Sequence, residues 1–205
     1  MPATDEIGAC RTALADVLAA QKATAAAQTA LASTSEALDR LLVFPTGQAW
    51  HKSRALSDGS HRLAMARLAF GGVPRAVVDG RELQRAGYTY TVDTLRELRH
   101  EFPDAQLLLV VGADQAEALH TWRDAADIAQ LATISIAARA RPTGGQGAID
   151  TSRLPPGPRA AVDLPPMPFS STEIRTRVAG GGTITDLVPG AVARYIEDHH
   201  LYQPT

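Results

Sequence analysis

The chain has 205 residues, of which 45 % are hydrophobic and 20 % are charged, as in an ordinary soluble globular protein. Its 20 basic and 22 acidic residues give a net charge of −2, which argues against a sequence-independent nucleic-acid binder. The single cysteine, Cys10, excludes an internal disulfide and suits the cytoplasm. The longest apolar run, 107–111, is too short to cross a bilayer. Asp5 and Glu6 stand where a secretory signal would be basic, so no such signal is expected.

Short apolar strands and amphipathic helices are predicted to alternate along the chain. An alanine-rich segment at 9–38 predicts one or two helices. Apolar runs then predict strands at 41–44, 76–78, 107–111, 133–137 and 160–164. Apolar spacing and helix-start signals predict helices at 58–70, 122–131, 171–179 and 189–199, the last with Pro189 in its first position. Two further helices are predicted to begin at Thr91 or Thr94 and after Asp114. Residues 140–168 contain seven of the thirteen prolines and are predicted to be mostly loop.

This alternation predicts an α/β fold with an open, largely parallel sheet flanked by helices. In such sheets, ligands bind beyond the carboxyl ends of the strands. The loops to search for a site are therefore 45–52, 112–114 and 165–172.

The stretch "PFSSTEIR" opens a predicted helix with three hydroxyls, a carboxylate and an arginine. Ser170 and Glu173 have the spacing of a capping box, so a plain helix cap is one interpretation. The other is an anion site, because helix N-termini offer amides and positive potential. Arg175 should lean back over Ser171 and Thr172, and a guanidinium beside hydroxyls suits phosphate.

The stretch "GADQAEALHTW" follows the clearest predicted strand. Gly112 would let a ligand approach the backbone. Asp114 either caps the next helix or accepts hydrogen bonds from a ligand. Trp122 is either an ordinary core residue or the flat wall of an aromatic pocket.

Two other stretches offer weaker signals. "FPTGQAWHK" follows a predicted strand and contains His51 and Lys52, which suit phosphate but equally suit a solvated loop. "YTYTVDTL" begins a helix, where capping is the plain interpretation of Thr91 or Thr94.

Taken in order, these motifs resemble the nicotinate-nucleotide adenylyltransferases of bacterial NAD biosynthesis. The matching stretches run from about residue 38 onward: "LDRLLVFPTGQAWHK", "HRLAMARLAF", "YTVDTLRELR", "LLLVVGADQAEALHTWRDAADIAQLA", "PFSSTEIRTRV" and "LVPGAVARYIEDHHLY". The pairing of "YTVDTL" with "GAD…TW" distinguishes this family from relatives that share only the fold, such as an adenylyltransferase acting on phosphopantetheine.

The resemblance implies a Rossmann-like nucleotidyltransferase fold with a C-terminal helical section, in a single domain over 1–205. Within it, 1–37 is an atypical alanine-rich segment and 140–168 a Pro/Gly-rich loop region. The implied reaction is cytoplasmic and joins ATP, with Mg²⁺ on its phosphates, to nicotinate mononucleotide, giving deamido-NAD and pyrophosphate. The expected partners are small-molecule nucleotides, with no nucleic acid or membrane and no metal bound by side chains.

The resemblance also implies roles for individual residues. Those implied at the ATP site are Gly112 and Asp114 beside the adenosine, Ser171, Thr172 and Arg175 at the phosphates, and His51 and Lys52 near the phosphates. Those implied at the nicotinate pocket are Thr91 and Trp122, with Trp122 beside the pyridine ring.

One family motif has no counterpart in the sequence. The family has a glycine-rich turn, G-G-x-F-D-P-x-H-x-G-H, whose histidines contact phosphates, and it should fall near 12–25. Here that segment reads "TALADVLAAQKATA", and the first histidine of the chain is His51. No catalytic residue is therefore assigned. Losing one such preformed contact typically lowers the rate about 10²–10³-fold.

Three explanations fit the missing motif. The start of the chain could come from a frameshifted or misassigned gene. The protein could instead be an impaired relative that binds nucleotides without efficient catalysis. Other groups, such as Lys22, could also substitute in part for the histidines.

Overall fold

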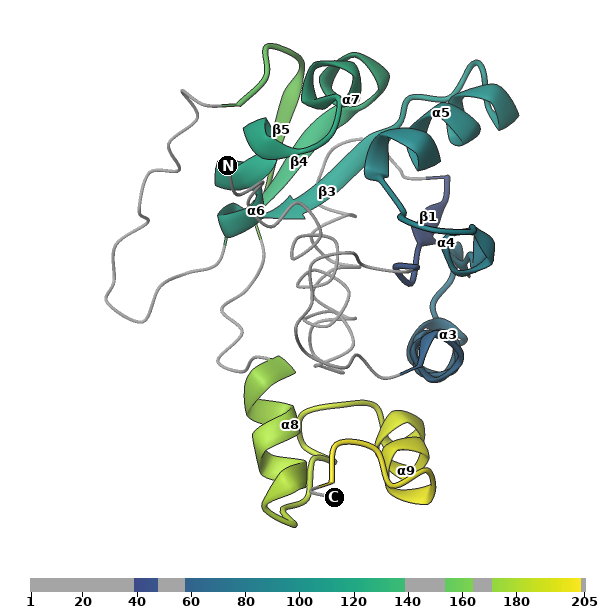
Figure 1. Cartoon of the computed structure of the whole chain (residues 1–205), viewed down its shortest axis with the longest axis vertical. Coiled ribbons are helices and arrows are strands. Elements are labelled where there is room, and N and C mark those ends of the chain that lie inside the picture. The colour runs from purple at the N-terminus through teal and green to yellow at the C-terminus, as the bar shows by residue number, and fades with distance from the viewer. Residues whose placement is uncertain (1–38, 48–57, 139–153, 164–170, 204–205) are drawn as a thin grey trace. The chain divides into compact units, whose positions relative to one another are not determined.

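The computed structural model describes residues 39–47, 58–138, 154–163 and 171–203 (Figure 1). The helices predicted at 9–38 and the residues His51, Lys52 and Ser170 lie outside this described part. The described residues fall into two compact units. The β3–β5 unit comprises 85–138 and 154–163, and the β1–β2 unit comprises 39–47, 58–84 and 171–203. Each unit has its own parallel sheet and its own hydrophobic core.

Three parallel strands form the sheet of the β3–β5 unit. They are β3 (Leu108–Gly112), β4 (Thr133–Ala138) and β5 (Arg159–Asp163), with β4 in the centre (Figure 1). Leu108 lies opposite Thr133 in the register, and Ile134 lies opposite Arg159. Ile134, Ser135 and Ile136 are all buried, so both faces of β4 are covered, as is usual for a parallel strand.

Four helical segments belong to the same unit: α5 (Thr91–Glu101), α6 (Ala113–Ala118), the 3₁₀ helix η1 (Leu119–Thr121) and α7 (Ala125–Leu131). The helices α6 and α7 pack against the sheet, and α5 packs against α7. Val92, Leu119 and Ile128 are at most 1 % exposed and form the centre of the core, together with Val111 at the end of β3. Burying each side chain of this size stabilises the fold by roughly 1.5–3 kcal/mol.

The β1–β2 unit begins with a β-α-β arrangement. Strand β1 (Leu41–Val43) pairs in parallel with β2 (Ala76–Val78), and α3 (Gly59–Phe70) lies between them in sequence. A short helix, α4 (Arg81–Gln84), follows β2. Asp58 caps α3 by accepting a 2.7 Å hydrogen bond from the backbone amide of Ser60.

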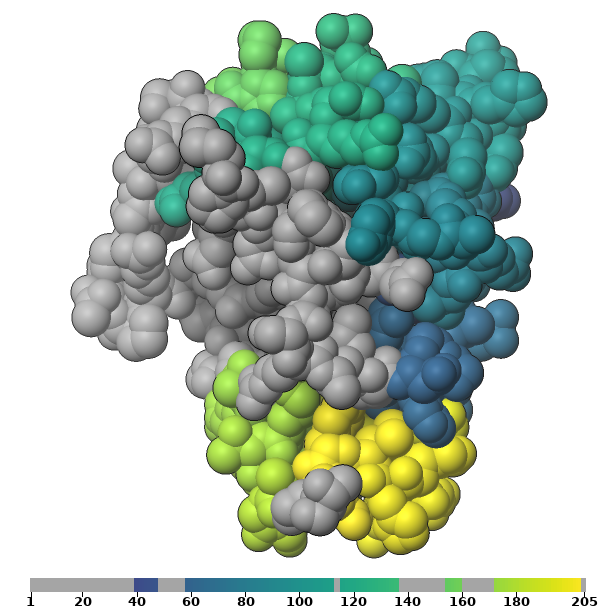
Figure 2. Space-filling view, viewed as in Figure 1, coloured from purple at the N-terminus to yellow at the C-terminus, as the bar shows by residue number. Residues whose placement is uncertain are grey.

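The C-terminal helices α8 (Ser171–Ala179) and α9 (Gly190–Asp198) complete the β1–β2 unit. Figure 2 shows the light-green surface of α8 directly beside the yellow surface of the segment that includes α9. Ile174 joins Val192 and Ile196 in one core. Helix α8 ends in a Schellman motif, in which Gly181 has a φ of 73° and the amide of Gly182 donates to the carbonyl of Arg177 over 2.8 Å.

Most predicted elements are confirmed, and the parallel pairing is confirmed for every strand that the structure describes. The predicted helix at 122–131 is wrong in its start, because Trp122 is extended and α7 begins only at Ala125. Pro189 is the N-cap of α9 and not its first helical residue. Helix α4, a single turn, was not predicted from the sequence. Among the described helices, none is long and apolar enough to cross a membrane.

Candidate functional site

The first group of predicted site residues lies in the β3–β5 unit, where α5 begins. Thr91 is its first residue, and the N-cap is Tyr90, which is extended and makes no capping hydrogen bond through its side chain. Capping by Thr91 or Thr94, the plain interpretation of this stretch, is therefore wrong. Thr94 is buried, and its hydroxyl accepts a 2.9 Å hydrogen bond from Arg85. Thr91 is half-buried, and its neighbour Val92 anchors the turn in the core.

The end of β3 supplies the second segment. Gly112 is both the last residue of β3 and the N-cap of α6, with an ordinary φ of −70°. A side chain there would meet no described atom within 4 Å, so the backbone is open to a close approach. Asp114 is the second residue of α6, so the alternative in which it caps this helix is wrong.

Trp122 supplies the third segment and lies in the core of this unit. It is 5 % exposed and belongs to the same cluster as Val92 and Val111. Its indole nitrogen is buried without a hydrogen-bond partner among the described residues. The placement fits the core interpretation of Trp122. Because the cluster also contains the neighbours of Thr91 and Gly112, the structure brings these three segments of the site together.

An aromatic contact links two of these segments, and sequence reasoning missed it. The guanidinium carbon of Arg123 lies 4.4 Å from the centre of the Tyr90 ring, in the range of a cation–π interaction. Tyr90 precedes Thr91, and Arg123 follows Trp122. The sequence contained a weak signal for this contact, namely a cation and an aromatic residue beside the two predicted pocket residues.

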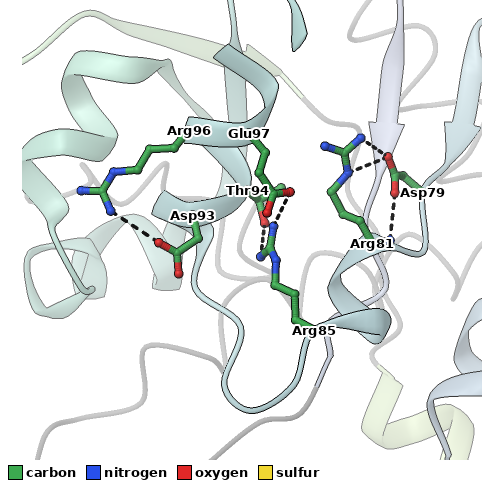
Figure 3. Close-up of polar contacts among 7 residues, drawn as sticks. All are labelled: Asp79, Arg81, Arg85, Asp93, Thr94, Arg96 and Glu97. Carbon is green, nitrogen blue, oxygen red and sulfur yellow. Dashed lines mark hydrogen bonds and ion pairs between the residues drawn. The ribbon is translucent and has the colours of Figure 1, made fainter. Parts of the chain in front are cut away.

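Ion pairs surround the same region. Arg85 contacts Glu97 over 2.6 Å in addition to its hydrogen bond with Thr94 (Figure 3). Arg96 contacts Asp93, which is also drawn in Figure 3, over 3.4 Å. Arg96 further contacts Asp124, the N-cap of α7, over 3.1 Å and Asp127, in the first turn of α7, over 2.5 Å. Hydrogen bonding to these carboxylates raises the pKa of the Arg96 guanidinium above its ordinary value.

The second group of predicted site residues lies at the start of α8, in the β1–β2 unit. Ser171 is the first residue of this helix, and Thr172 is exposed. Arg175 is half-buried and donates a 3.4 Å hydrogen bond to the hydroxyl of Thr172, which confirms the predicted lean over the first turn. Ile174 fixes the helix by packing in the core.

The other charges of α8 are paired with one another. Arg177 contacts Glu173 over 3.4 Å and Asp186 over 3.0 Å. Arg175 has no carboxylate contact among the described residues. The helix start thus presents a hydroxyl, a guanidinium and helix-terminal amides together, which is the chemistry of an anion site.

Sequence reasoning also missed an arginine of α3 that contacts the loop after β1. Arg62 reaches from α3 and donates hydrogen bonds to the carbonyls of Thr46 and Gly47. Burial lowers the pKa of the Arg62 guanidinium from its ordinary value. This contact fixes the backbone just before the segment that carries His51 and Lys52, which is outside the described residues.

Comparisons with known proteins define the class of the chain. The cytidylyltransferase-like family matches residues 25–177. A solved structure of the Plasmodium falciparum nicotinic acid mononucleotide adenylyltransferase, complexed with APC, superposes with a TM-score of 0.64 at 16 % identity. The superposition covers 87 % of this chain and 90 % of that one, which shows a shared nucleotidyltransferase fold of the Rossmann-like type.

Similarity to curated proteins narrows the class. A "probable nicotinate-nucleotide adenylyltransferase" of Albidiferax ferrireducens is 49 % identical over 166 residues, or 81 % of this chain and 84 % of the relative. A protein with the same description from Clavibacter michiganensis subsp. michiganensis is 39 % identical over 81 % of this chain and 80 % of the relative. The chain therefore belongs to the nicotinate-nucleotide adenylyltransferase family, within the cytidylyltransferase-like proteins.

Proposed function

We propose that this protein transfers the adenylyl group of ATP to nicotinate mononucleotide, giving deamido-NAD and pyrophosphate. The observation that supports this most strongly is the 49 % identity with a family member over 81 % of the chain. We take residues 1–205 as one nucleotidyltransferase domain that acts on small nucleotides in the cytoplasm.

The proposed roles follow the two described groups of residues. Thr91 and Trp122 line the nicotinate pocket, and Gly112 and Asp114 lie against the adenosine. In the β1–β2 unit, the start of α8 binds the ATP phosphates through Ser171, Thr172 and Arg175. His51 and Lys52 follow in sequence the loop residues that Arg62 contacts, and their proposed place is near the same phosphates.

The reaction needs positioning and charge neutralisation and no covalent intermediate. A phosphate oxygen of nicotinate mononucleotide attacks the α-phosphorus of ATP, and the bond from that phosphorus to the pyrophosphate oxygen breaks. Arg175 neutralises charge that builds up on the phosphate oxygens, and the nicotinate pocket holds the nucleophile in line.

Magnesium would enter with the ATP phosphates and neutralise further charge on them. The described residues contain no cluster of three or more His, Cys, Asp or Glu side chains that could hold a metal ion. No described residue is therefore assigned to magnesium.

A second candidate function is nucleotide binding with impaired catalysis. The observation that favours it is the absence of the motif G-G-x-F-D-P-x-H-x-G-H from the sequence, beside an intact "SSTEIR". Without the histidines, transfer would be slower by about 10²–10³-fold for each lost contact, while the two nucleotide pockets still bind.

Pyrophosphate release separates these candidates. The purified chain is mixed with ATP, Mg²⁺ and nicotinate mononucleotide, and release is compared with reactions that omit either nucleotide. Release that requires both nucleotides supports the transferase. If well-folded protein binds nicotinate mononucleotide in calorimetry but releases no pyrophosphate, the second candidate is supported. If it shows neither binding nor pyrophosphate release, both candidate functions are contradicted.

A further inference from the structure

Arg123 is an exposed cation beside the proposed nicotinate pocket. It follows the buried Trp122, and its guanidinium carbon lies 4.4 Å from the centre of the Tyr90 ring. Tyr90 in turn precedes Thr91. The contact therefore joins the two chain segments that carry the proposed pocket residues, and it places a positive charge next to both.

The partner of Arg123 differs from those of the other arginines described in this unit. Arg85 and Arg96 contact carboxylates, whereas Arg99 donates to the carbonyls of Ala105 and Leu131. The guanidinium of Arg123 contacts the face of the Tyr90 ring, whereas the other three arginines contact carboxylate or carbonyl oxygens. A ring supports a guanidinium without cancelling its charge, so the cation stays able to attract an anion.

The nearest acid in sequence is held by another arginine. Asp124 follows Arg123 directly, but its carboxylate lies 3.1 Å from Arg96, which also contacts Asp127 over 2.5 Å. Arg96 thereby directs two carboxylates of this region toward itself. Within the described part of the chain, Arg123 therefore contacts the Tyr90 ring and no carboxylate, and its charge can attract a ligand.

We propose that Arg123, supported by Tyr90, makes the pocket selective for a pyridine ring with a carboxylate over one with a carboxamide. The inference rests on the proposed function. The two nucleotides have nearly the same shape and differ by one negative charge, so a nearby guanidinium discriminates between them by charge. Arg123 is here a specificity residue and takes no part in bond formation.

The test compares the binding of two nucleotides to the full chain. Dissociation constants for nicotinate mononucleotide and nicotinamide mononucleotide are measured by calorimetry, which needs no catalysis. For Arg123→Gln, we expect the preference for nicotinate mononucleotide to fall about tenfold, equivalent to about 1.4 kcal/mol. Nicotinamide mononucleotide should bind almost unchanged, and the unfolding temperature should not move because the side chain is exposed.

Two further variants isolate the charge from the packing. Arg123→Lys keeps a cation and should retain most of the preference. Arg96→Gln leaves Arg123 in place but releases Asp124, so it should lower the preference by a smaller factor than Arg123→Gln. A preference unchanged in Arg123→Gln would overturn this inference alone. Failure of the unsubstituted protein to bind either nucleotide would overturn the proposed function and the inference with it.

Discussion

The two groups of proposed site residues differ in how the fold holds them. Around Trp122, the site is part of the core of its unit, and residues beside Thr91 and Gly112 share that core. At the start of α8, Thr172 is exposed and Arg175 is half-buried, and Ile174 is the residue among those described in this turn that packs in a core. A site built from core residues has a fixed shape but couples binding to stability. A surface site with unpaired charge can change its affinity without unfolding the protein.

The largest expected effect is a loss of stability when the core around Trp122 is disrupted. Trp122→Ala should lower the free energy of unfolding by about 3–5 kcal/mol, because it opens a cavity among Val92, Val111 and Leu119. Chemical denaturation followed by circular dichroism measures this loss. Trp122→Phe keeps a ring in the core and should lose much less. A fully stable Trp122→Ala variant would mean that Trp122 is not a core residue.

The next effect concerns the surface site. Arg175→Gln should weaken ATP binding roughly 10–100-fold, because hydrogen bonds to charged groups contribute about 1.5–3 kcal/mol. Its unfolding free energy should stay within about 0.5 kcal/mol of the unsubstituted protein.

Arg177→Gln is the matched control on the same helix. Its guanidinium is occupied by Glu173 and Asp186, so ATP affinity, measured by calorimetry, should not change. Equal losses of ATP affinity in both variants would show that α8 has only a general charge effect, and no site at Arg175.

A smaller effect tests the polar framework beside the core site. Arg85→Met removes the ion pair with Glu97 and the hydrogen bond to Thr94 (Figure 3). We expect a loss of about 1 kcal/mol of unfolding free energy, since Arg85 is largely buried while Glu97 is partly exposed. Urea titration measures it, with Arg85→Lys as a partial replacement. An unchanged midpoint would show that packing alone holds this region.

The smallest effect is a pH dependence in the β1–β2 unit. Hydrogen bonds from the side chain and the backbone amide of Ser60 lower the pKa of Asp58 below its ordinary value. The stabilisation is therefore present above the unfolded pKa, about 3.9, and is lost as the pH falls through the lower folded value. Asp58→Asn keeps a capping side chain and should remove this part of the acid dependence. The check is the unfolding temperature of the unsubstituted protein and of Asp58→Asn, measured between pH 2 and 6. An identical loss of stability in both proteins as the pH falls would contradict this prediction.

Much of the fold could be predicted because the signals are local. The β2 strand and the α8 helix have their predicted bounds, since apolar runs and helix-start residues depend on near neighbours. The start of α7 could not be predicted in this way. Asp124 adopts a left-handed conformation with a φ of 51°, and Trp122 leaves the helical path to reach the core. Both depend on tertiary packing.

The roles of the predicted site residues stay predictions, whereas their local contacts can be compared with the structure. The lean of Arg175 toward Thr172 follows from helix geometry and was predicted. Capping by Thr91 or Asp114 was not found, because each helix begins at least one residue earlier than capping requires. The contacts of Arg62 with Thr46 and of Arg123 with Tyr90 join segments far apart in sequence, so the local pattern of residues does not establish them.

The most direct test of the proposed transfer follows the label from ATP marked at the α-phosphorus. The full chain is incubated with this ATP, Mg²⁺ and nicotinate mononucleotide, and the nucleotides are then separated. We predict labelled deamido-NAD that forms only when both nucleotides are present and more slowly with Arg175→Gln. Label that stays in ATP, or appears only in AMP, with folded protein would contradict the assignment of adenylyl transfer to this chain.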